Sequence, residues 1–306
     1  MTKLLRDARA FARRAKMSAH RIFAVVEGRN FDRPYYERLL EQVPYTEDAR
    51  RISVRLAEEI ELDGESAGGK SHALQLREFF ESRAELKQSN QGGDVLIMFF
   101  LDRDVDDFVR GAPPRNVVHT EMQDVEAQIL WLGDLKRAVG SSHGLASAQV
   151  TKLTELDNIP GSLAALWREW ILLRLIAESA NAPSTARFAQ TSQINKPWYG
   201  AIDPAAHAEL CSRVATAVGV DAFSTARLLA STYFDERLAA GRSAELVKGK
   251  WAASYVLHYV HSTLSDETIR ANVSNEALLS ACLETIEFKG DCVQRVEEAI
   301  DLALSS

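Results

Sequence analysis

The sequence predicts an α/β protein with a mainly parallel sheet and flanking helices, followed by a mostly α-helical domain. Short apolar runs at residues 22–26 and 95–101 are typical of buried strands, because each is bounded by a turn signal. Helical patterns alternate with such runs in the first half, which favours parallel pairing. Beyond about residue 141 nearly every segment has a helical pattern. We therefore expect an α/β domain over 1–140 and a helical domain over 141–306.

The elements of the first half follow one another at short intervals. Apolar residues recur at helical spacing over residues 3–18, and the strand at 22–26 follows directly. Asp32 is expected to cap the next helix, which carries Pro34 in its first turn. The remaining expected elements are strands at 51–56, 95–101 and 116–119, and helices over about 71–86 and from about 125 to Trp131.

The second half is expected to contain four main helices, over residues 162–179, 222–239, 251–264 and 291–304. The first of these is apolar on most sides, which indicates either a buried core helix or an interface helix. The interface interpretation would suit a homodimer.

Composition places the chain among ordinary globular proteins. Hydrophobic residues make up 46% and charged residues 26% of its 306 positions. Its three cysteines are widely spaced and form no disulfide or zinc pattern, which fits a reducing, cytoplasmic setting. No apolar stretch reaches the roughly 20 residues that a membrane-spanning helix needs.

Charge is unevenly distributed along the chain. The formal net charge is -7, yet residues 1–21 hold seven Lys or Arg and one acid, so the remainder carries -13. The negative net charge of the whole chain argues against non-specific electrostatic attraction to nucleic acid. The basic arm predicts a helix that contacts RNA, DNA or an acidic partner, although a solvated helix explains it equally well. An Arg-rich, acid-poor arm is also typical of transit peptides.

Acidic residues follow the two clearest strands. Glu27 and Gly28 end the first, and Asp102 and Asp104 follow the second. Because carboxyl ends of parallel strands meet at one edge of a sheet, and side chains alternate along a strand, these acids could face a common site. Carboxylates are the ligands that Mg²⁺ and Mn²⁺ prefer, and Glu126 is a further candidate ligand.

Simpler interpretations of these acids exist. A Glu-Gly pair after a strand is commonly a turn, and Asp106 and Asp107 extend the acidic run into what could be a solvated loop or a helix cap. Four like charges at 102–107 repel one another unless a cation neutralises them. A bound metal ion could neutralise these charges, or the side chains of Arg103 and Arg110 could fold back onto them.

These motifs resemble the Toprim (topoisomerase–primase) domain. Val26-Glu27-Gly28 with Asp32, and Leu101-Asp102-Arg103-Asp104, are similar to its Glu after one strand and its Asp-x-Asp after another. The stretch from Val118 to Glu126 is similar to OLD-like Toprim nucleases, and the layout resembles the Toprim effector of PARIS-type anti-phage defence.

The resemblance implies a Toprim-like catalytic domain and an endonuclease that cuts RNA, possibly tRNA, or DNA. It implies Mg²⁺ or Mn²⁺ held by the set Glu27, Asp32, Asp102, Asp104 and Glu126. Glu27 would also do acid–base work. It further implies a separate ABC-type ATPase as partner, with RNA favoured because the chain has no ATPase domain of its own.

A glycine-rich loop offers a competing interpretation. Gly64–Ser71 matches the P-loop pattern G-x-x-x-x-G-K-[ST], in which Lys70 and Ser71 would meet phosphate and Mg²⁺. A P-loop follows a central buried strand, whereas residues 58–63 are acidic. One alternative is a turn before a helix that brings Lys70 near the carboxylates, where it could contact a substrate phosphate; similar Gly-Gly-Lys turns appear in the OLD-like relatives. The other alternative is a plain connecting loop.

Lys250 is the last candidate. Lys248-Gly249-Lys250 opens a helix, where two cations oppose the helix dipole, which favours a phosphate partner, although an exposed basic turn explains the pattern equally well. The family resemblance implies that Lys250 binds substrate or stabilises the transition state. Two other classes remain open: a P-loop nucleotide hydrolase, and a non-catalytic module that binds a protein.

Overall fold

The computed structural model describes residues 6–28, 30–43, 51–109, 111–182, 192–270 and 272–305. It confirms the α/β class, and the chain divides into two compact units. Unit 1 takes residues 1–102, 113–120 and 287–306, and unit 2 takes 103–112 and 121–286. This division differs from the expected boundary near residue 140, because the chain leaves unit 1 directly after Asp102, returns to it for residues 113–120, and returns again for the last helix.

Unit 1 is built on a five-stranded sheet in which all strands but one are parallel. Strand β6 lies centrally, with β2 along one edge and with β5 and β7 against opposite ends of the other edge. Strand β3 pairs with β2, and β5 is the antiparallel member. The strands are β2 (His20–Val26), β3 (Arg51–Leu56), β5 (Lys87–Asn90), β6 (Gly93–Leu101) and β7 (Val117–His119).

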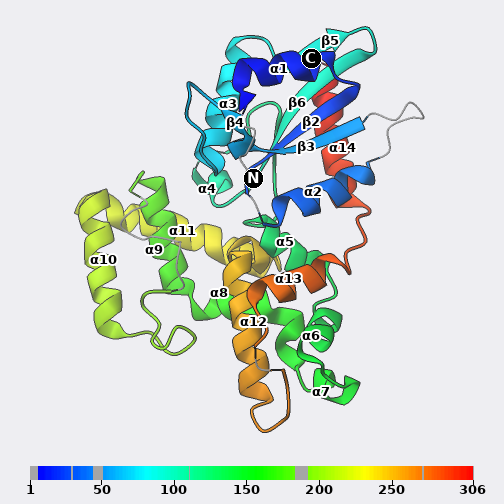
Figure 1. The fold of residues 1–306 in the computed structure, drawn as a ribbon. Coiled ribbons are helices and arrows are strands. Elements are labelled where there is room, and N and C mark those ends of the chain that lie inside the picture. Colours follow the sequence, from blue (N-terminus) through cyan, green and yellow to red (C-terminus); the bar gives the residue numbers. More distant parts are fainter. Residues whose placement is uncertain are drawn as a thin grey trace. The chain divides into compact units, whose positions relative to one another are not determined.

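Helices cover both faces of this sheet (Figure 1). On one face α1 (Ala8–Met17) and α3 (Lys70–Ser82) pack on β2 and β6, and the rings of Phe11 and Phe23 meet edge to face at 5.6 Å. The other face carries α2 (Asp32–Glu41) and α14 (Asp291–Leu304). Because both faces are buried, β2 and β6 are continuous apolar runs, which is why the sequence predicts them so clearly.

One strand pairing in unit 1 was not expected from the sequence. β1 (Arg6–Asp7) and β4 (Ile60–Glu61) form a separate parallel pair, and a 3₁₀ turn at Ala57–Glu59 precedes β4. Consequently α1 begins at Ala8 rather than at residue 3, with Asp7 as its N-cap. Residues 3–5 of the expected helix lie outside the described residues.

Unit 2 is helical, as expected. Its α-helices are α4 (Asp106–Val109), α5 (Val125–Leu132), α6 (Leu135–His143), α7 (Ser147–Thr151), α8 (Ile159–Leu166), α9 (Arg168–Ser179), α10 (Pro204–Val218), α11 (Val220–Ala239), α12 (Gly249–Thr263) and α13 (Asn275–Leu283). Among the described residues of this unit, 3₁₀ turns lie at Thr154–Asn158 and Ser243–Glu245.

The predicted single helix over 162–179 is two helices, α8 and α9, which meet at Trp167. Trp167 and Trp170 are both fully buried, and the Trp251 ring from α12 lies 4.7 Å from that of Trp170. The apolar character of this segment is therefore explained by burial inside unit 2. None of the helices in the described ranges is long and apolar enough to cross a bilayer.

Candidate functional site

Two of the predicted acids meet at the carboxyl edge of the unit 1 sheet. Glu27 directly follows β2 and Asp102 directly follows β6, and these strands pair in parallel with Val26 opposite Phe100. The backbone N–H of Asp102 donates to Oε2 of Glu27 at 3.4 Å. Both side chains are half-buried. The parallel pairing therefore brings these two acids together at one edge, as the strand pattern predicts.

Asp32 belongs to the same group, although not as the expected helix cap. The N-cap of α2 is Phe31, which makes no side-chain cap, and Asp32 is the first helical residue. The buried Asp32 carboxylate instead accepts the Gly28 N–H at 2.5 Å. A Cβ on Gly28 would lie 3.0 Å from a carboxylate oxygen of Asp32, so this turn favours glycine.

Tyr36 lies near two of these acids, Asp32 and Asp102. It is buried one helical turn beyond Asp32, and its ring lies 4.9 Å from that of Phe100 on β6. Burial raises the pKa of Tyr36 well above its usual value, and the charges of Tyr35, Asp32 and Asp102 raise it further. Asp32 and Asp102 therefore both lie close enough to Tyr36 for their charges to act on its hydroxyl group.

The glycine loop ends beside these carboxylates. Gly69 has a φ of +90° and is the N-cap of α3, and its N–H donates to the Glu27 carbonyl at 3.4 Å. Lys70 follows, and its ammonium donates to the backbone carbonyl of Asp102. The structure thus brings Lys70 to the acids of unit 1, as the milder interpretation of this loop predicts.

The structural context of a P-loop is not present in the described part of unit 1. The strand before the loop, β4, pairs only with β1 and stands outside the five-stranded sheet. Leu62 and Glu65 exchange two backbone hydrogen bonds, at 2.9 and 3.0 Å, across Asp63 and Gly64. Both intervening residues have positive φ. The first glycine of the pattern therefore closes a tight two-residue turn.

Unit 2 contains the other predicted residues in a separate charge cluster. Strand geometry ends at Leu101, and Asp104 has a φ of +50°, so the alternation that was expected to align it with Asp102 does not extend this far. The Asp104 N–H donates to the Gln123 carbonyl at 2.8 Å. Its carboxylate pairs with Lys248 at 2.7 Å.

Asp124 joins the starts of two helices in this cluster. It is buried and N-caps α5, where its Oδ1 accepts the Ala127 N–H at 2.8 Å. The same oxygen accepts the Gly249 N–H at 2.8 Å, from the start of α12. Burial raises the pKa of Asp124 to about 7, and the Glu126 charge adds to the rise, while Lys248 opposes it.

Glu126 and Lys250 face each other across this junction. The Glu126 carboxylate is buried, and Lys250 Nζ lies 3.4 Å from its Oε1. The charge of Glu126 raises the pKa of Lys250. Arg174, fully buried, donates to the Gln123 side chain at 2.9 Å. Three cations thus accompany three acids, the other cation being Lys248.

The rest of the acidic run is neutralised by arginines. Asp107 accepts from Arg103 at 2.7 Å and also from Arg237, and these charges lower its pKa against the opposing effect of burial. Arg103 pairs in addition with Glu245 at 3.1 Å. Arg103 therefore folds back onto the run, as one interpretation expected. Arg110, the other proposed partner, lies outside the described residues.

The sequence did not single out Lys248 and Asp124 as site residues. Asp124 was visible as an acid just before a helix, and Lys248 as part of the Lys-Gly-Lys start of another. Asp124 contacts the start of α12, and Lys248 pairs with Asp104. Both contacts join residues far apart in the chain, so no local pattern shows them.

The donor chemistry in unit 1 fits a hard divalent cation. Glu27, Asp32 and Asp102 offer carboxylate oxygens, and Mg²⁺ commonly binds through one or two carboxylates and keeps several waters. Among the described residues, no group of three or more His, Cys, Asp or Glu side chains is already arranged to hold a metal. A metal in unit 1 would therefore be bound by few protein ligands.

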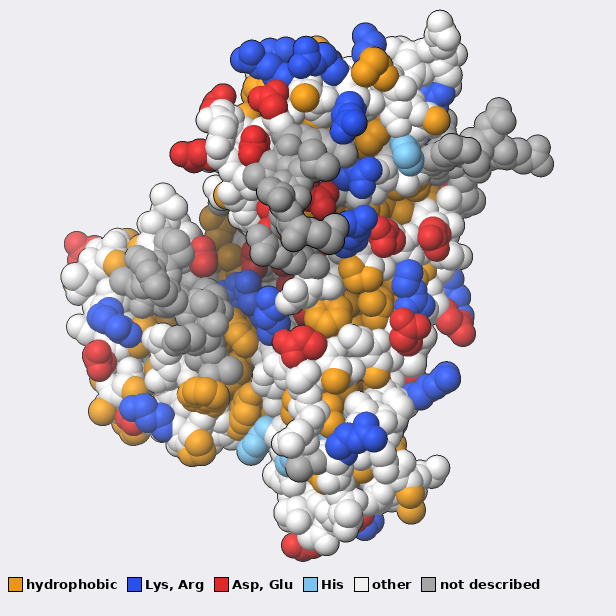
Figure 2. Space-filling view, viewed as in Figure 1, with side chains coloured by type: hydrophobic (Ala, Val, Ile, Leu, Met, Phe, Trp, Pro, Cys, Tyr) orange, Lys and Arg blue, Asp and Glu red, His pale blue; other side chains and the backbone are white. Residues whose placement is uncertain are grey.

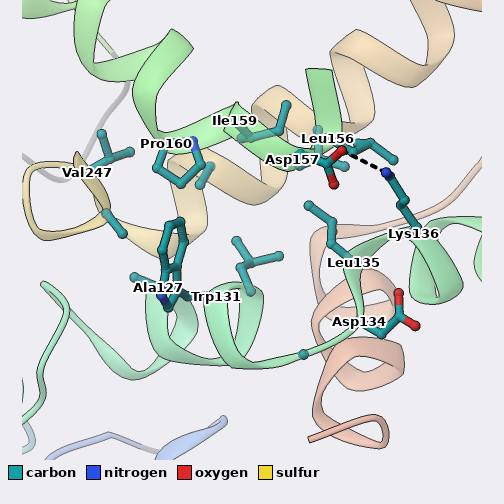
Figure 3. Close-up of a pocket in the computed structure, with 15 residues that line it drawn as sticks. Ala127, Trp131, Asp134, Leu135, Lys136, Leu156, Asp157, Ile159, Pro160 and Val247 are labelled. Atoms are coloured by element: carbon teal, nitrogen blue, oxygen red, sulfur yellow. Dashed lines mark hydrogen bonds and ion pairs between the residues drawn. The ribbon is translucent and has the colours of Figure 1, made fainter. Parts of the chain in front are cut away.

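A cavity of about 320 Å³ lies elsewhere in unit 2. Figure 3 shows Trp131, Leu135 and Pro160 at its wall, with the Lys136–Asp157 ion pair, 2.7 Å long, at one side. The lining is mostly apolar and includes none of the predicted site residues.

Comparison with known proteins assigns the chain to no family. The chain matches no protein-family model, and no curated protein matches it significantly. The class that is established is thus the α/β fold itself.

Proposed function

We propose that this protein is a metal-dependent nuclease that hydrolyses phosphodiester bonds in RNA or DNA, with its metal at the unit 1 carboxylates. The observation that supports this best is the meeting of Glu27 and Asp102 at the ends of two adjacent parallel strands. Ligand sites of open α/β sheets lie at this edge. A divalent cation bound there would neutralise phosphate charge and activate a water.

Each residue of unit 1 has a role in this proposal. Asp102 and Asp32 hold the cation, and the Gly28 N–H fixes the orientation of the Asp32 carboxylate. Glu27 is a further ligand of the cation and also the acid–base group, because its carboxylate lies at the strand end and is only half-buried. Lys70, held at the Asp102 carbonyl, supplies a positive charge for the substrate phosphate.

Two residues of unit 2 are candidate metal ligands on the Toprim resemblance alone. They are Asp104, which pairs with Lys248, and Glu126, which pairs with Lys250. Lys250 is mostly exposed and is suited to contact a substrate phosphate. A role in anti-phage defence, a preference for RNA and an ABC-type ATPase partner rest on the Toprim resemblance alone, and are proposed on that ground.

Thermal stability with and without Mg²⁺ or Mn²⁺ tests the proposed site. A ligand that binds only the folded state raises the melting temperature. We expect a rise in the wild type, its loss in Asp102→Asn and in Glu27→Gln, and its retention in Asp301→Asn, which changes an exposed acid of α14. Cleavage of labelled RNA and DNA should depend on metal and follow the same pattern. Cleavage that survives in Asp102→Asn and Glu27→Gln together would refute the proposal.

A further inference from the structure

Helix α1 has one face in the core and one face in solvent. Ala8, Phe11, Ala12 and Ala15 are buried against the sheet of unit 1. Four basic side chains lie on the exposed face, and we call them the α1 basic face: Arg9, Arg13, Arg14 and Lys16. Figure 2 shows Lys and Arg side chains gathered where Figure 1 places this helix.

The charges of the α1 basic face are not neutralised within the described residues. None of its four side chains takes part in an ion pair or a side-chain hydrogen bond there. Elsewhere in unit 1 the cations Arg33, Arg77 and Arg83 all pair with acids. The α1 basic face therefore projects its charge into solvent.

Helix stability accounts for only part of this pattern. Arg14 and Lys16 lie in the last turn of α1, where the helix dipole favours cations. Arg9 lies in the first turn, where the dipole disfavours them, and that turn contains no acid. Asp7 caps the helix through the N–H groups of Arg9 and Ala10. Its single charge does not balance the four cations.

The side chains of the α1 basic face are regularly spaced, and a hydrogen bond from Asn90 ties the end of the helix to the neighbouring strand. Arg9, Arg13 and Lys16 follow the i, i+4, i+7 spacing of one helical stripe, about 10 Å long at 1.5 Å per residue. The far end is fixed by Asn90, whose side-chain amide donates to the Lys16 carbonyl at 2.7 Å. Asn90 also accepts from the Arg21 guanidinium at 2.6 Å, and being neutral it leaves the charge of Arg21 in place.

We infer that the α1 basic face, extended by Arg21, is a binding surface for the phosphate backbone of a nucleic acid. Three of its four members are arginines, whose planar guanidinium matches phosphate oxygens in pairs. A bilayer is a poorer partner, because an interfacial helix must bury its apolar face in lipid, and the apolar face of α1 is already in the protein core. The inference rests on the proposed function for the identity of the polyanion.

Salt-dependent binding tests this inference without any cleavage. Each phosphate contact adds about 0.9 to the slope of log affinity against log salt on duplex DNA. Fluorescently labelled duplexes of about 20 base pairs, in RNA and in DNA, would be titrated in EDTA. We expect the triple variant Arg9→Gln, Arg13→Gln, Arg14→Gln to lose about 2 to 3 from the slope, and about tenfold or more in affinity.

The matched control removes the same charge from exposed positions elsewhere: Arg137→Gln, Arg213→Gln and Lys289→Gln. It should bind almost as the wild type does, and melting curves should show both variants folded. Equal slopes in the two triple variants would overturn the inference. The inference would also be overturned if the α1 triple variant kept its nucleic-acid binding and lost binding only to phosphatidylserine vesicles or to an acidic peptide. Because no metal is present, neither outcome depends on whether Glu27 and Asp102 catalyse cleavage.

Discussion

Gly249 donates its backbone N–H to Oδ1 of Asp124 at 2.8 Å, and this atom also accepts from Ala127. One buried oxygen therefore satisfies a donor at the start of each of two helices, α5 and α12. The approach is so close that a Cβ on Gly249 would lie 2.0 Å from the backbone nitrogen of Ala127. The charged residues Glu126 and Lys250 are held opposite each other by this junction.

Gly249→Ala is therefore expected to destabilise the protein strongly. The added methyl group would clash with backbone atoms, which cannot move aside as a flexible side chain could, so the two helices must separate. We expect a loss of about 3 kcal/mol or more in the free energy of unfolding, measured in urea. Gly140→Ala in α6 is the control, because its Cβ would meet only a methyl group of Val150 at 3.3 Å. A Gly249→Ala protein as stable as this control would contradict the prediction.

Asp124→Asn and Asp124→Ala should differ, because only the first keeps a side-chain oxygen that accepts hydrogen bonds. We expect Asp124→Ala to cost about 2 to 3 kcal/mol, since it leaves two buried N–H donors without their acceptor. Asp124→Asn should cost less than half of that. Urea denaturation of both variants measures the difference, and equal losses would show that the negative charge matters more than the hydrogen bonds.

ATP should not bind at the glycine loop. Gly64 lies in a tight turn, and β4 is not part of the five-stranded sheet. We expect ATP with Mg²⁺ to raise the melting temperature no further than Mg²⁺ alone. Ser71→Ala should keep near-normal cleavage, whereas Lys70→Met should lower it about 100-fold through the lost charge at the phosphate. An ATP-dependent rise that Lys70→Met abolishes and Glu27→Gln preserves would favour the nucleotide hydrolase instead.

His143 should make unit 2 sensitive to mild acid. It is buried, its Nδ1 bonds the Val139 carbonyl at 3.2 Å, and its Nε2 has no hydrogen-bond partner among the described residues. Burial lowers its pKa from 6.5, and the nearby His261 and Arg270 lower it further. The unfolded chain therefore takes up a proton first as pH falls below about 6.5, and stability drops.

The corresponding measurement is urea unfolding at several pH values between about 7.5 and 5. In His143→Asn the part of the stability loss that begins near pH 6.5 should disappear. His258→Asn, at an exposed position of α12, should behave as the wild type does. A His143→Asn protein with an unchanged pH profile would show that this histidine does not titrate as its burial requires.

The sequence predicted best those elements whose burial is complete. The strands ending at Val26 and Leu101 are covered on both faces, and their continuous apolar runs record this directly. Strand β5 was missed because Lys87–Asn90 is wholly polar and pairs at the end of the sheet. The break at Trp167 was also missed, since the apolar residues Leu163, Leu166, Trp170 and Ile171 keep a helical spacing across it.

Within the candidate site, the sequence predicted the meeting of two acids in unit 1 but not the contacts that the other acids make. Glu27 and Asp102 could be placed because each directly follows a strand. Asp32 was expected to cap its own helix, yet its carboxylate accepts a hydrogen bond from the Gly28 N–H, a contact that depends on the preceding turn. Asp104 was expected to align with Asp102, but its positive φ ends the strand alternation on which that expectation depended.

The return of α14 to unit 1 has a consequence for synthesis. One face of the sheet is covered by α2 and by this late helix, whereas the strands that form the sheet are all made by residue 119. While the ribosome adds the next 170 or so residues, at roughly 5 to 20 per second, that apolar face lacks one of its two covering helices. The nascent chain thus exposes part of this apolar face for about ten seconds or more. During that time a chaperone could bind it. The sheet that carries the unit 1 carboxylates is therefore covered on both faces only after α14 has been synthesised.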